Sequence, residues 1–337
     1  MLAATFIDDA AFTAETAPLA TSRMKVVGFA GVSGDITATA TGLGATTLDF
    51  TTLDLNVGQW IKIGGTGAGN RFATAALNDF ARVTAIAATA LTLDNLPAAW
   101  ATDAGTGKTI EVWFSDCLKN GTTKKGVEIE RGFMDQASPT FILQKGMLVD
   151  KFSMKTDAKQ KVTASFTYTG MSGVQSTTSI DSTPDAAPDP TLYPVMAASA
   201  NVGRVGENGA QLTSPNWCKT IDLSLSNNLA PIEAVDSATP VDIAYGSCDV
   251  EATVDTYFGD NTLLTQLFAG TVASLNWRTT KGTQAVVWGI PAATATDGAP
   301  NAAKKDDRVM LLLKMTASYD ALTQAHLTLS RFEYFEA

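Results

Sequence analysis

Apolar and small polar residues alternate strictly in residues 161–170 of this 337-residue chain. A period of two places successive side chains on opposite faces of a β-strand. One face carries Val162, Ala164, Phe166 and Tyr168, and the other carries Thr163, Ser165, Thr167 and Thr169. Residues 147–156 form a strand just before it, so the two segments predict an antiparallel hairpin that turns near residues 157–160.

Similar short strands recur along the rest of the chain, separated by turn residues about every eight to twelve positions. In the first third they are expected at 35–41, 59–64, 79–86, 90–94 and 109–114. Further along they are expected at 126–133, 220–225, 248–256, 309–319 and 325–332. Many short strands with regular turns are typical of a mainly all-β fold.

One segment has the pattern of a short helix. Residues 261–268 read NTLLTQLF, with Asp260 or Asn261 as the N-cap and Gly270 as the stop signal. Two other segments have loop compositions. Residues 171–192 are rich in Ser, Thr, Pro and Asp, and residues 291–307 are rich in Ala, Gly, Asp and Lys. We therefore expect one flanking helix and two long loops.

The composition of the chain changes at residues 119–126, which read KNGTTKKG. Before this break the expected strands are short, and after it they lengthen. We therefore predict an N-terminal arm at 1–25, an extra small β-barrel-like domain at 26–118 and a larger core domain at 119–337. The core domain would contain the long loop at 171–192.

Charge argues against one class of function and is compatible with another. The net charge is −10, so the chain lacks the basic surface of a protein that reads nucleic-acid sequence. An acidic wall past which DNA slides remains compatible, because basic contacts would hold the duplex. Residues 117–171 contain nine Lys or Arg and five Asp or Glu, whereas 172–337 contain nine and eighteen. This asymmetry fits either attraction between identical subunits or a solvated basic hairpin.

The cysteines and the N-terminus bear on the compartment. Cys117, Cys218 and Cys248 are too few and too scattered for a disulfide framework, which indicates small buried side chains in a reducing compartment. The first residues include Asp8 and Asp9 where a signal peptide is apolar. No apolar run approaches the roughly 18 residues of a membrane span. We expect synthesis in the cytoplasm, no membrane association and departure only within a particle.

Residues suited to catalysis are scarce, and we expect no catalytic, cofactor-binding or metal-binding residues. General base catalysis and metal ligation usually use histidine, and the single histidine is His326. Its neighbours Ala325 and Leu327 alternate with it, so the pattern points His326 away from the core. No pair of cysteines has the spacing of a zinc site. The chain is therefore predicted not to be an enzyme.

Two motifs resemble functional sites but lack essential parts. Residues 105–109 read GTGKT, yet Thr102 occupies the position where a phosphate-binding loop needs its first glycine. The following residues, 110–114, have a strand pattern where that loop needs a helix. Glu128 and Glu130 could form a carboxylate pair, but spacing of two residues is routine on a solvated strand.

Three segments together carry a family resemblance. They are KGVEIERGFMDQASPTFILQKGMLVDKFSMKTDAKQKVTASFTYTGM at 125–171, SNNLAPIEAV at 226–235 and CDVEATVDTYFGDNTLLTQLF at 248–268. These strand, turn and short-helix patterns resemble the tail tube (major tail) proteins of long-tailed, siphovirus-type bacteriophages. The segment 59–95 is similar to an extra N-terminal β-domain that some members carry.

The resemblance implies a β-sandwich or barrel with one short flanking helix, and no cofactor. Six copies would close into a ring, and rings would stack head to tail into the tail tube, the conduit for DNA ejection. The partners would be the chain itself, the tape measure protein and the tail terminator and distal tail proteins, with double-stranded DNA passing through unbound. We expect interfaces between copies to use aromatic residues of the strands, namely Phe133, Phe141, Phe152, Phe166, Tyr168, Tyr257 and Phe258.

The same resemblance implies positions for individual segments. The hairpins at 147–170 and 220–256 would supply the channel lining and ring contacts, and the module at 28–116 would decorate the outside. The location would be the virion tail, after synthesis in the host cytoplasm.

Two alternatives stay open at this stage. One is a phage-surface or carbohydrate-binding β-sandwich module, in which tryptophans stack on sugars. The candidates are scattered singly along alternating strands, which favours packing roles for them: Trp60, Trp100, Trp113, Trp217, Trp277 and Trp288. The other alternative is an enzyme that uses His326 or Glu128.

Overall fold

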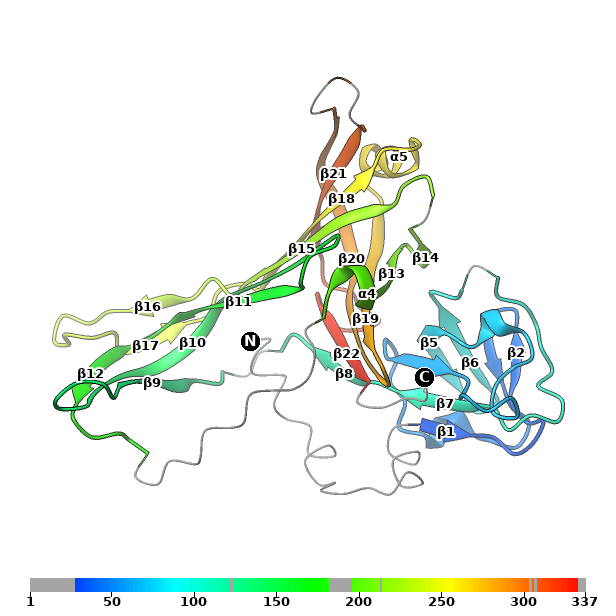
Figure 1. The fold of residues 1–337 in the computed structure, drawn as a ribbon, viewed down its shortest axis with the longest axis horizontal. Coiled ribbons are helices and arrows are strands. Elements are labelled where there is room, and N and C mark those ends of the chain that lie inside the picture. Colours follow the sequence, from blue (N-terminus) through cyan, green and yellow to red (C-terminus); the bar gives the residue numbers. More distant parts are fainter. Residues whose placement is uncertain are drawn as a thin grey trace.

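Two β-sheets of unequal size contain nearly all the described strands of the chain (Figure 1). The computed structural model describes residues 28–97, 99–121, 124–181, 196–212, 214–302, 305 and 308–332. The mainly all-β prediction is confirmed. The predicted N-terminal arm at 1–25 lies outside the described residues. Among those residues, no helix is long and apolar enough to cross a membrane, and no group of acidic, His or Cys residues could hold a metal.

The first sheet forms an N-terminal module with its own apolar core. Its seven strands run in the order β1-β7-β4-β5-β6-β3-β2. Ile36, Leu43, Phe50 and Ile61 are fully buried in it, which explains the apolar positions of this part of the chain. The strands are β1 (Gly28–Ala30), β2 (Thr37–Thr39), β3 (Gly42–Gly44), β4 (Trp60–Ile63), β5 (Phe80–Ala87), β6 (Ala90–Asp94) and β7 (Glu111–Phe114).

The second sheet has thirteen strands and builds the rest of the molecule. Its main path is β11-β10-β15-β18-β21-β20-β19-β13-β14, with β9 and β12 on β10 and with β22 and β8 beside β20. Its central strands are β10 (Thr140–Asp157), β11 (Thr163–Thr169), β15 (Cys218–Ser226), β18 (Asp249–Tyr257), β19 (Val272–Lys281), β20 (Gln284–Asn301) and β21 (Met310–Ala317). The others are β8 (Asp116–Lys119), β9 (Val127–Phe133), β12 (Ser172–Ser176), β13 (Val202–Glu207), β14 (Ala210–Gln211) and β22 (Thr328–Phe332).

The large sheet folds over on itself to enclose the main core. Alternate residues of β10, β15, β18 and β21 turn inward and meet the inward side of β19, β20 and β22. At the centre Trp288 stacks on Trp277, with ring centroids 6.2 Å apart, and on Phe152, at 5.6 Å. Stacked aromatic rings of this size bury large apolar areas, so this row anchors the two layers to each other.

An arm extends away from the sandwich at one side (Figure 1). It consists of β9, β12 and the first half of β10, together with a separate hairpin formed by β16 (Ala230–Ile232) and β17 (Asp242–Ala244). Asn227 ties the hairpin to β10, because its Nδ2 donates to the carbonyl of Val149 at 2.8 Å. Ile243 of this hairpin is fully buried, whereas Ile142 and Val174 of the arm sheet are exposed.

The predicted helix is present as α5 (Thr262–Ala269), between β18 and β19. Asp260 Oδ1 accepts a hydrogen bond from the amide of Thr262 at 2.9 Å, and Gly270 ends the helix in the left-handed conformation with φ 60°. The helix packs against the inner side of β20 and β21. Gly298 permits this approach, since a Cβ atom there would lie 2.8 Å from Leu313 Cδ2 and 3.1 Å from Leu267 Cδ2. A second, one-turn helix is α4 (Ala198–Asn201).

Two expected loops are partly strands, and these expectations were wrong in those parts. β20 continues through Asn301, so most of 291–307 is not a loop. Its Ala, Gly and Pro residues have weak strand propensity, but pairing with β21 overrides it. The segment 171–192 begins with β12, which pairs with β10. Residues 182–192 of this segment, and residues 193–195 after it, lie outside the described part of the chain.

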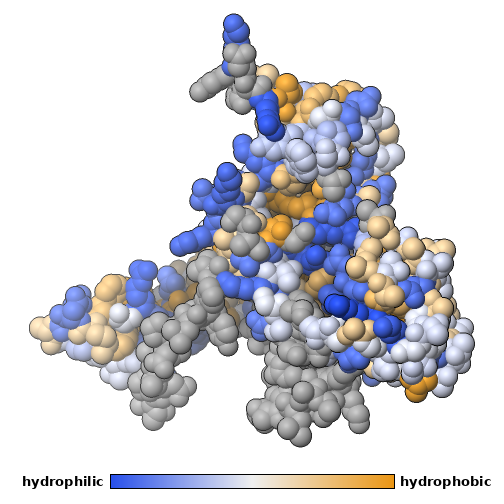
Figure 2. All heavy atoms as spheres, turned by 45° about the vertical axis from the view of Figure 1, so that its right-hand side comes forward, coloured by the Kyte–Doolittle hydropathy of each residue, from blue (hydrophilic) through white to orange (hydrophobic). Residues whose placement is uncertain are grey.

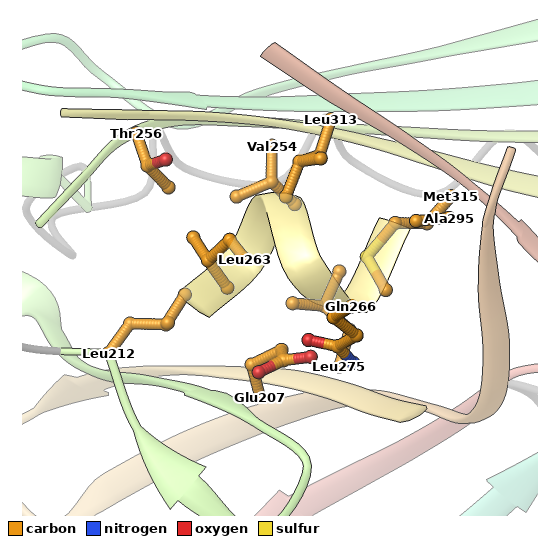
Figure 3. Close-up of a pocket in the computed structure, with 10 residues that line it drawn as sticks. All are labelled: Glu207, Leu212, Val254, Thr256, Leu263, Gln266, Leu275, Ala295, Leu313 and Met315. Atoms are coloured by element: carbon orange, nitrogen blue, oxygen red, sulfur yellow. The ribbon is translucent and has the colours of Figure 1, made fainter. Parts of the chain in front are cut away.

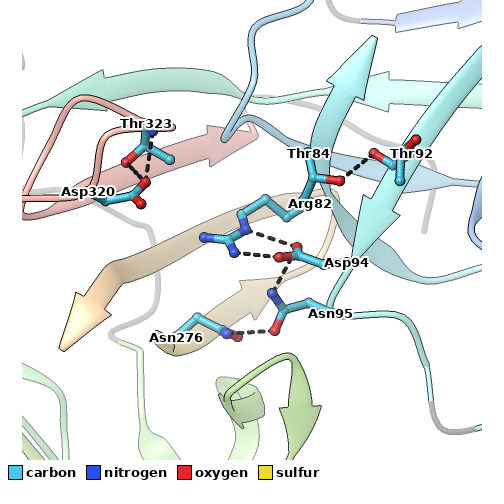
Figure 4. Close-up of polar contacts among 8 residues, drawn as sticks. All are labelled: Arg82, Thr84, Thr92, Asp94, Asn95, Asn276, Asp320 and Thr323. Carbon is cyan, nitrogen blue, oxygen red and sulfur yellow. Dashed lines mark hydrogen bonds and ion pairs between the residues drawn. The ribbon is translucent and has the colours of Figure 1, made fainter. Parts of the chain in front are cut away.

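The N-terminal module is joined to the sandwich by a mixed apolar and polar junction. Phe80 of the module and Phe332 of β22 pack edge to face with centroids 5.0 Å apart, and the Arg278 guanidinium lies 4.1 Å from the Phe80 ring. Figure 4 shows the polar part, in which Asn276 Nδ2 donates to Asn95 Oδ1 at 2.8 Å. These partners on the sandwich side belong to β19 and β22, and the module also contacts Ala285 and Val287 of β20 and Arg204 of β13.

Candidate functional site: a polar sheet face and two free edges

One face of the large sheet is polar across five consecutive strands. In one row that crosses the sheet, Ser165, Ser153, Ser224, Glu251 and Thr316 stand side by side on β11, β10, β15, β18 and β21. The reverse side of the same strands forms the core, so alternation assigns these residues to the outer face. The sequence pattern therefore builds a broad surface of small polar and charged groups.

The neighbouring row of residues across the five strands carries charged side chains, two of which form an ion pair with each other. It contains Thr163, Lys155, Asp222, Thr253 and Lys314. Lys155 Nζ lies 3.9 Å from a carboxylate oxygen of Asp222. Exposed ion pairs contribute little to stability, so their main effect is on the surface potential.

Two more ion pairs lie on this face. Lys314 Nζ is 3.0 Å from a Glu251 carboxylate oxygen, and Lys219 Nζ is 3.9 Å from one of Asp255. Partial burial raises the pKa of Asp255, and the charge of Lys219 opposes that shift. Three lysines of the face are therefore held next to carboxylates, whereas the exposed Lys151, between Thr167 and Ser226, has no carboxylate partner among the described residues.

The sheet that carries this face ends in a free edge on each side. On one side, β11 pairs with β10; residues 160–162 just before β11 bond to residues 196–198, and no described strand pairs with the other side of Thr163–Thr169. On the other side, residues 295–301 of β20 pair with β21 alone, because β19 reaches only Ala293 and Thr294. Unpaired strand edges carry rows of free backbone donors and acceptors, which template pairing with another chain.

Exposed apolar side chains lie beside each free edge. On β11, Phe166 is 42% exposed and Tyr168 is 37% exposed, with ring centroids 6.5 Å apart. Beside the β20 edge, Phe268 at the end of α5 is 81% exposed, and Val272 is 61% exposed. Figure 2 shows apolar surface at the upper end of the molecule, where Figure 1 places α5.

The aromatic residues predicted at interfaces occupy different environments. The structure brings together only Phe152, Phe166 and Tyr168, and of these Phe152 lies in the core, 3% exposed. Phe133 and Phe141 are half-buried in the arm sheet. The remaining two are half-buried near α5: Phe258 packs against its apolar cluster, and the Tyr257 ring lies 5.4 Å from the Arg308 guanidinium.

Sequence reasoning missed Phe268, Val272 and the β20 edge. The helix pattern did contain a signal for Phe268, because Leu263, Leu264 and Leu267 already fill the apolar side of so short a helix. No local pattern marked residues 295–301 as an edge, since only the order of strands in the sheet reveals it.

A small pocket lies between α5 and the sheet (Figure 3). Eight of its ten lining residues are aliphatic, Met or Thr, and the others are Glu207 and Gln266. Burial raises the pKa of Glu207, and a hydrogen bond with Gln266 opposes the shift. One carboxyl group in an apolar pocket has no second catalytic group beside it among these lining residues.

The motifs that resemble catalytic sites have structural surroundings. His326 lies between the fully buried Ala325 and Leu327, and its Nδ1 is 3.3 Å from Asn120 Nδ2. The GTGKT segment forms a turn that leads into β7, and Lys108 Nζ donates to the carbonyl of Ala68 at 2.8 Å. Both carboxylate oxygens of Glu130 accept hydrogen bonds from residues 179 and 180.

A family model described as phage tail tube protein matches residues 26–321 of the chain. The chain belongs to the phage tail tube protein family. A search of the curated proteins finds no match. The resemblance seen in 125–171 is confirmed, and the tail tube protein has the all-β architecture expected of it.

Membership assigns a structural role to the surfaces described above. A tail tube protein is a component of the virion tail and assembles with its own copies into a tube. The polar face and the free edges are therefore surfaces of an assembling subunit.

Proposed function

We propose that six copies of the chain close into a ring, that rings stack head to tail, and that the polar face of β11, β10, β15, β18 and β21 lines the channel. Six-fold rings and head-to-tail stacking are what the resemblance to siphovirus-type tail tube proteins implies. Double-stranded DNA passes through this channel when the phage ejects its genome. The observation that carries the proposal is the polar face itself, which spans five strands and on which Lys155, Lys219 and Lys314 are in ion pairs.

The chemistry of the face suits transient passage of DNA. A protein that neutralises phosphates with Lys or Arg releases counterions and gains affinity with each contact. Lys155, Lys219 and Lys314 each have a carboxylate within 4 Å, and the other positions are mostly Ser and Thr. Such a wall hydrates well and has few groups that hold a phosphate.

The position of the N-terminal module agrees with this orientation. The module contacts β13, β19, β22 and the first half of β20, which lie in the layer of the sandwich away from the polar face. With the polar face inward, the module decorates the outside of the tube. It then leaves the channel unobstructed.

The arm supplies contacts between successive rings in this proposal. It extends from the sandwich and exposes apolar side chains of three elements, including Ile142, Val174 and Val235. A single subunit leaves these side chains in water. Contact with a copy in the next ring buries them, which favours stacking. Heterologous contacts of this kind continue indefinitely, and so produce a tube rather than a closed particle.

The remaining partners and the location follow from the same assembly. The tape measure protein occupies the channel before ejection, and tail terminator and distal tail proteins cap the two ends. The chain is made in the host cytoplasm and acts without catalysis. The competing proposal of a sugar-binding module is disfavoured by burial, because Trp60, Trp113, Trp277 and Trp288 lie in apolar clusters.

Electron microscopy of the purified full-length chain tests this proposal. We expect rings and stacked tubes in negative stain, and sedimentation that shifts to large species as the concentration rises. A control variant with Ser153→Lys and Ser224→Lys changes only exposed positions of the polar face, so it should still fold. A chain that remains monomeric at every concentration would contradict the proposal.

Passage of DNA has its own test. Phage particles assembled with Ser153→Lys and Ser224→Lys subunits should eject their genomes more slowly than wild-type particles, and added salt should reduce the difference. Equal ejection rates at low salt would argue that the polar face does not line the channel.

A further inference from the structure

We propose that the carboxyl group of Glu207 is a protonation switch that controls how firmly α5 packs on the large sheet. The neutral carboxyl group is accommodated between the helix and the sheet, whereas the ionised carboxylate draws water into that space and loosens the helix. This device belongs to the single subunit, so it goes beyond the proposed ring and does not depend on it.

Strand register places the Glu207 carboxyl group on the apolar side of β13. Val205 and Glu207 lie on the same face of this strand and pair with Trp277 and Leu275 of β19. Trp277 is fully buried and Leu275 is 1% exposed, and Val205 packs against the same core. A glutamate therefore occupies a position where the alternation of the strand predicts an apolar side chain.

The carboxyl group enters the pocket between α5 and the sheet. Figure 3 shows it beside the side chain of Gln266, which comes from α5. The other eight lining residues are aliphatic, Met or Thr. Gln266 can bond either the neutral or the charged carboxyl group, but it carries no charge that would compensate an ionised one. Burial raises the pKa of Glu207, and the hydrogen bond with Gln266 opposes this shift.

Charged side chains of the packed elements face away from this pocket in the described part of the chain. The helix, Thr262–Ala269, has no ionisable side chain. Asp260, just before it, is bonded to Asn216. Arg204 and Arg278 lie on the reverse side of β13 and β19, towards the N-terminal module. Three further charged residues alternate with lining positions and so lie on the outer face: Asp255 of β18, Asp297 of β20 and Lys314 of β21.

The helix above the pocket depends on packing for its stability. It has eight residues, and isolated helices shorter than about 12–15 residues are marginal in water. Leu263 is buried against Leu311 and Leu313 of β21. A carboxylate beneath these contacts is costly to bury without water, so ionisation favours hydration of the pocket and weakens the contacts. Because α5 ends in the exposed Phe268, the switch also controls how well that apolar surface is ordered.

The dependence on pH has a defined sign. With the helix packed, Glu207 holds its proton at a pH where the opened or unfolded chain has released it. Packing of α5 is therefore firmest when Glu207 is neutral and weakens as the pH rises above the ordinary value of 4.5. The equilibrium for opening can increase by up to about tenfold for each pH unit by which the fold raises the pKa.

Hydrogen–deuterium exchange on dispersed full-length subunits tests the switch. Exchange of each amide is compared with the rate of an unfolded chain at the same pH, from about pH 4 to about pH 8. We expect protection of the α5 amides to fall as the pH rises, while amides of β15, an interior strand, stay protected. Glu207→Gln keeps the shape and the polar contact but cannot ionise, so its α5 protection should not change with pH. Glu128→Gln, at an exposed glutamate of β9, is the matched control and should behave as wild type.

A second variant distinguishes a titrating carboxyl group from a merely structural one. Gln266→Leu removes the polar partner that favours the charged form, so the fall in α5 protection should move to higher pH. A fall that stays in place or moves to lower pH would count against the switch. Protection of α5 that is independent of pH in wild type, or that changes equally in Glu207→Gln, would overturn it. These results leave the proposed ring untouched, because dispersed subunits are measured.

Discussion

Phe152 of β10 and Phe166 of β11 face each other across the sheet with ring centroids 4.9 Å apart, yet their exposures are 3% and 42%. Phe152 stacks on Trp288 inside the sandwich. Phe166 extends this row of aromatic rings onto β11, where its own ring is only partly covered. The core of the subunit therefore extends onto an edge strand whose apolar side is only half covered, and the missing cover is the surface that a second copy can supply.

Substitution of the two phenylalanines should separate folding from assembly. Phe152→Ala removes a buried ring and should lower the free energy of unfolding by about 3–5 kcal/mol. Phe166→Ala removes a half-exposed ring, so we expect a loss of about 1 kcal/mol in the dispersed subunit but a marked loss of tube formation. Denaturant unfolding of dispersed subunits and sedimentation of assembled protein measure the two effects. Equal stability losses, or normal assembly by Phe166→Ala, would oppose this account.

A charged substitution at Phe268 should block assembly without harming the fold. Phe268→Asp changes a side chain that is 81% exposed at the end of α5, so the free energy of unfolding should change by about 0.5 kcal/mol or less. Tube formation should fall at least tenfold, because the charge would be buried against a neighbouring copy. Val32→Asp is the matched control: Val32 is exposed on the N-terminal module, and its variant should assemble normally. Sedimentation compares the two, and equal behaviour would argue against a contact at Phe268.

The carboxylate of Asp35 should make the N-terminal module sensitive to acid. Burial raises the pKa of Asp35, but hydrogen bonds from Thr46, Thr47 and Leu48 outweigh that effect and lower it to about 2, from 3.8. The unfolded chain thus takes up a proton at higher pH than the folded one. The stabilisation is complete above about pH 4 and is lost as the pH falls towards 2.

Asp35→Asn tests this dependence. The amide keeps one oxygen for the bonds from Thr46 and Thr47, but its NH2 group then faces the Leu48 amide, which donates to Oδ2 at 3.0 Å, so stability at neutral pH should fall by about 1–3 kcal/mol. Thermal unfolding between pH 2 and pH 7 should show a smaller acid-induced loss for this variant than for wild type. Parallel curves for the two proteins would mean that Asp35 does not set the acid response.

Lys62 should make stability rise with pH in the alkaline range, in the same direction as Asp35 does in the acidic range. Burial lowers the pKa of Lys62 to about 8, from 10.5; Asp79 opposes this shift, and Arg278 and Arg71 add to it. The unfolded chain therefore holds this proton at a pH where the folded chain has lost it. Between pH 8 and 10.5 the contribution of Lys62 to the free energy of unfolding should rise with pH.

Denaturant unfolding of Lys62→Met measures this contribution. The variant should lack the rise between pH 8 and 10.5, whereas Lys145→Met, at an exposed lysine of the arm, should keep it. Lys62 Nζ also donates to the carbonyls of Ile63, Gly64 and Asn78, so the variant loses stability at neutral pH as well. A wild-type pH profile retained in Lys62→Met would contradict the assignment.

Alternation in the sequence predicted strands well where one face is buried by neighbours. The expected strand at 90–94 coincides with β6, and the hairpin at 147–170 is present as β10 and β11. β11 shows the same alternation without burial of one face. All its residues from Thr163 to Tyr168 are exposed in a single subunit. Its alternation is that of a strand with a buried face, which agrees with cover by another copy.

The failures have a common physical cause. β12 and the second half of β20 contain Gly, Ser, Pro and Ala, whose local preferences favour turns, and both are strands because a long neighbour pairs with them. The polar face could not be predicted as a site, because its rows join residues from five segments and depend on strand order. Phe152 was expected at an interface together with Phe166 and Tyr168, and its burial could not be predicted because it depends on Trp288 from a distant segment.

The most direct test of the account is a cryo-electron microscopy reconstruction of the assembled tube at a resolution that separates β-strands. We predict rings of six copies in which Ser153, Ser224 and Glu251 face the channel, with the N-terminal module outside. A tube whose channel is lined by the N-terminal module, with the polar face of β10, β15 and β18 turned to the outer surface, would contradict the central claim.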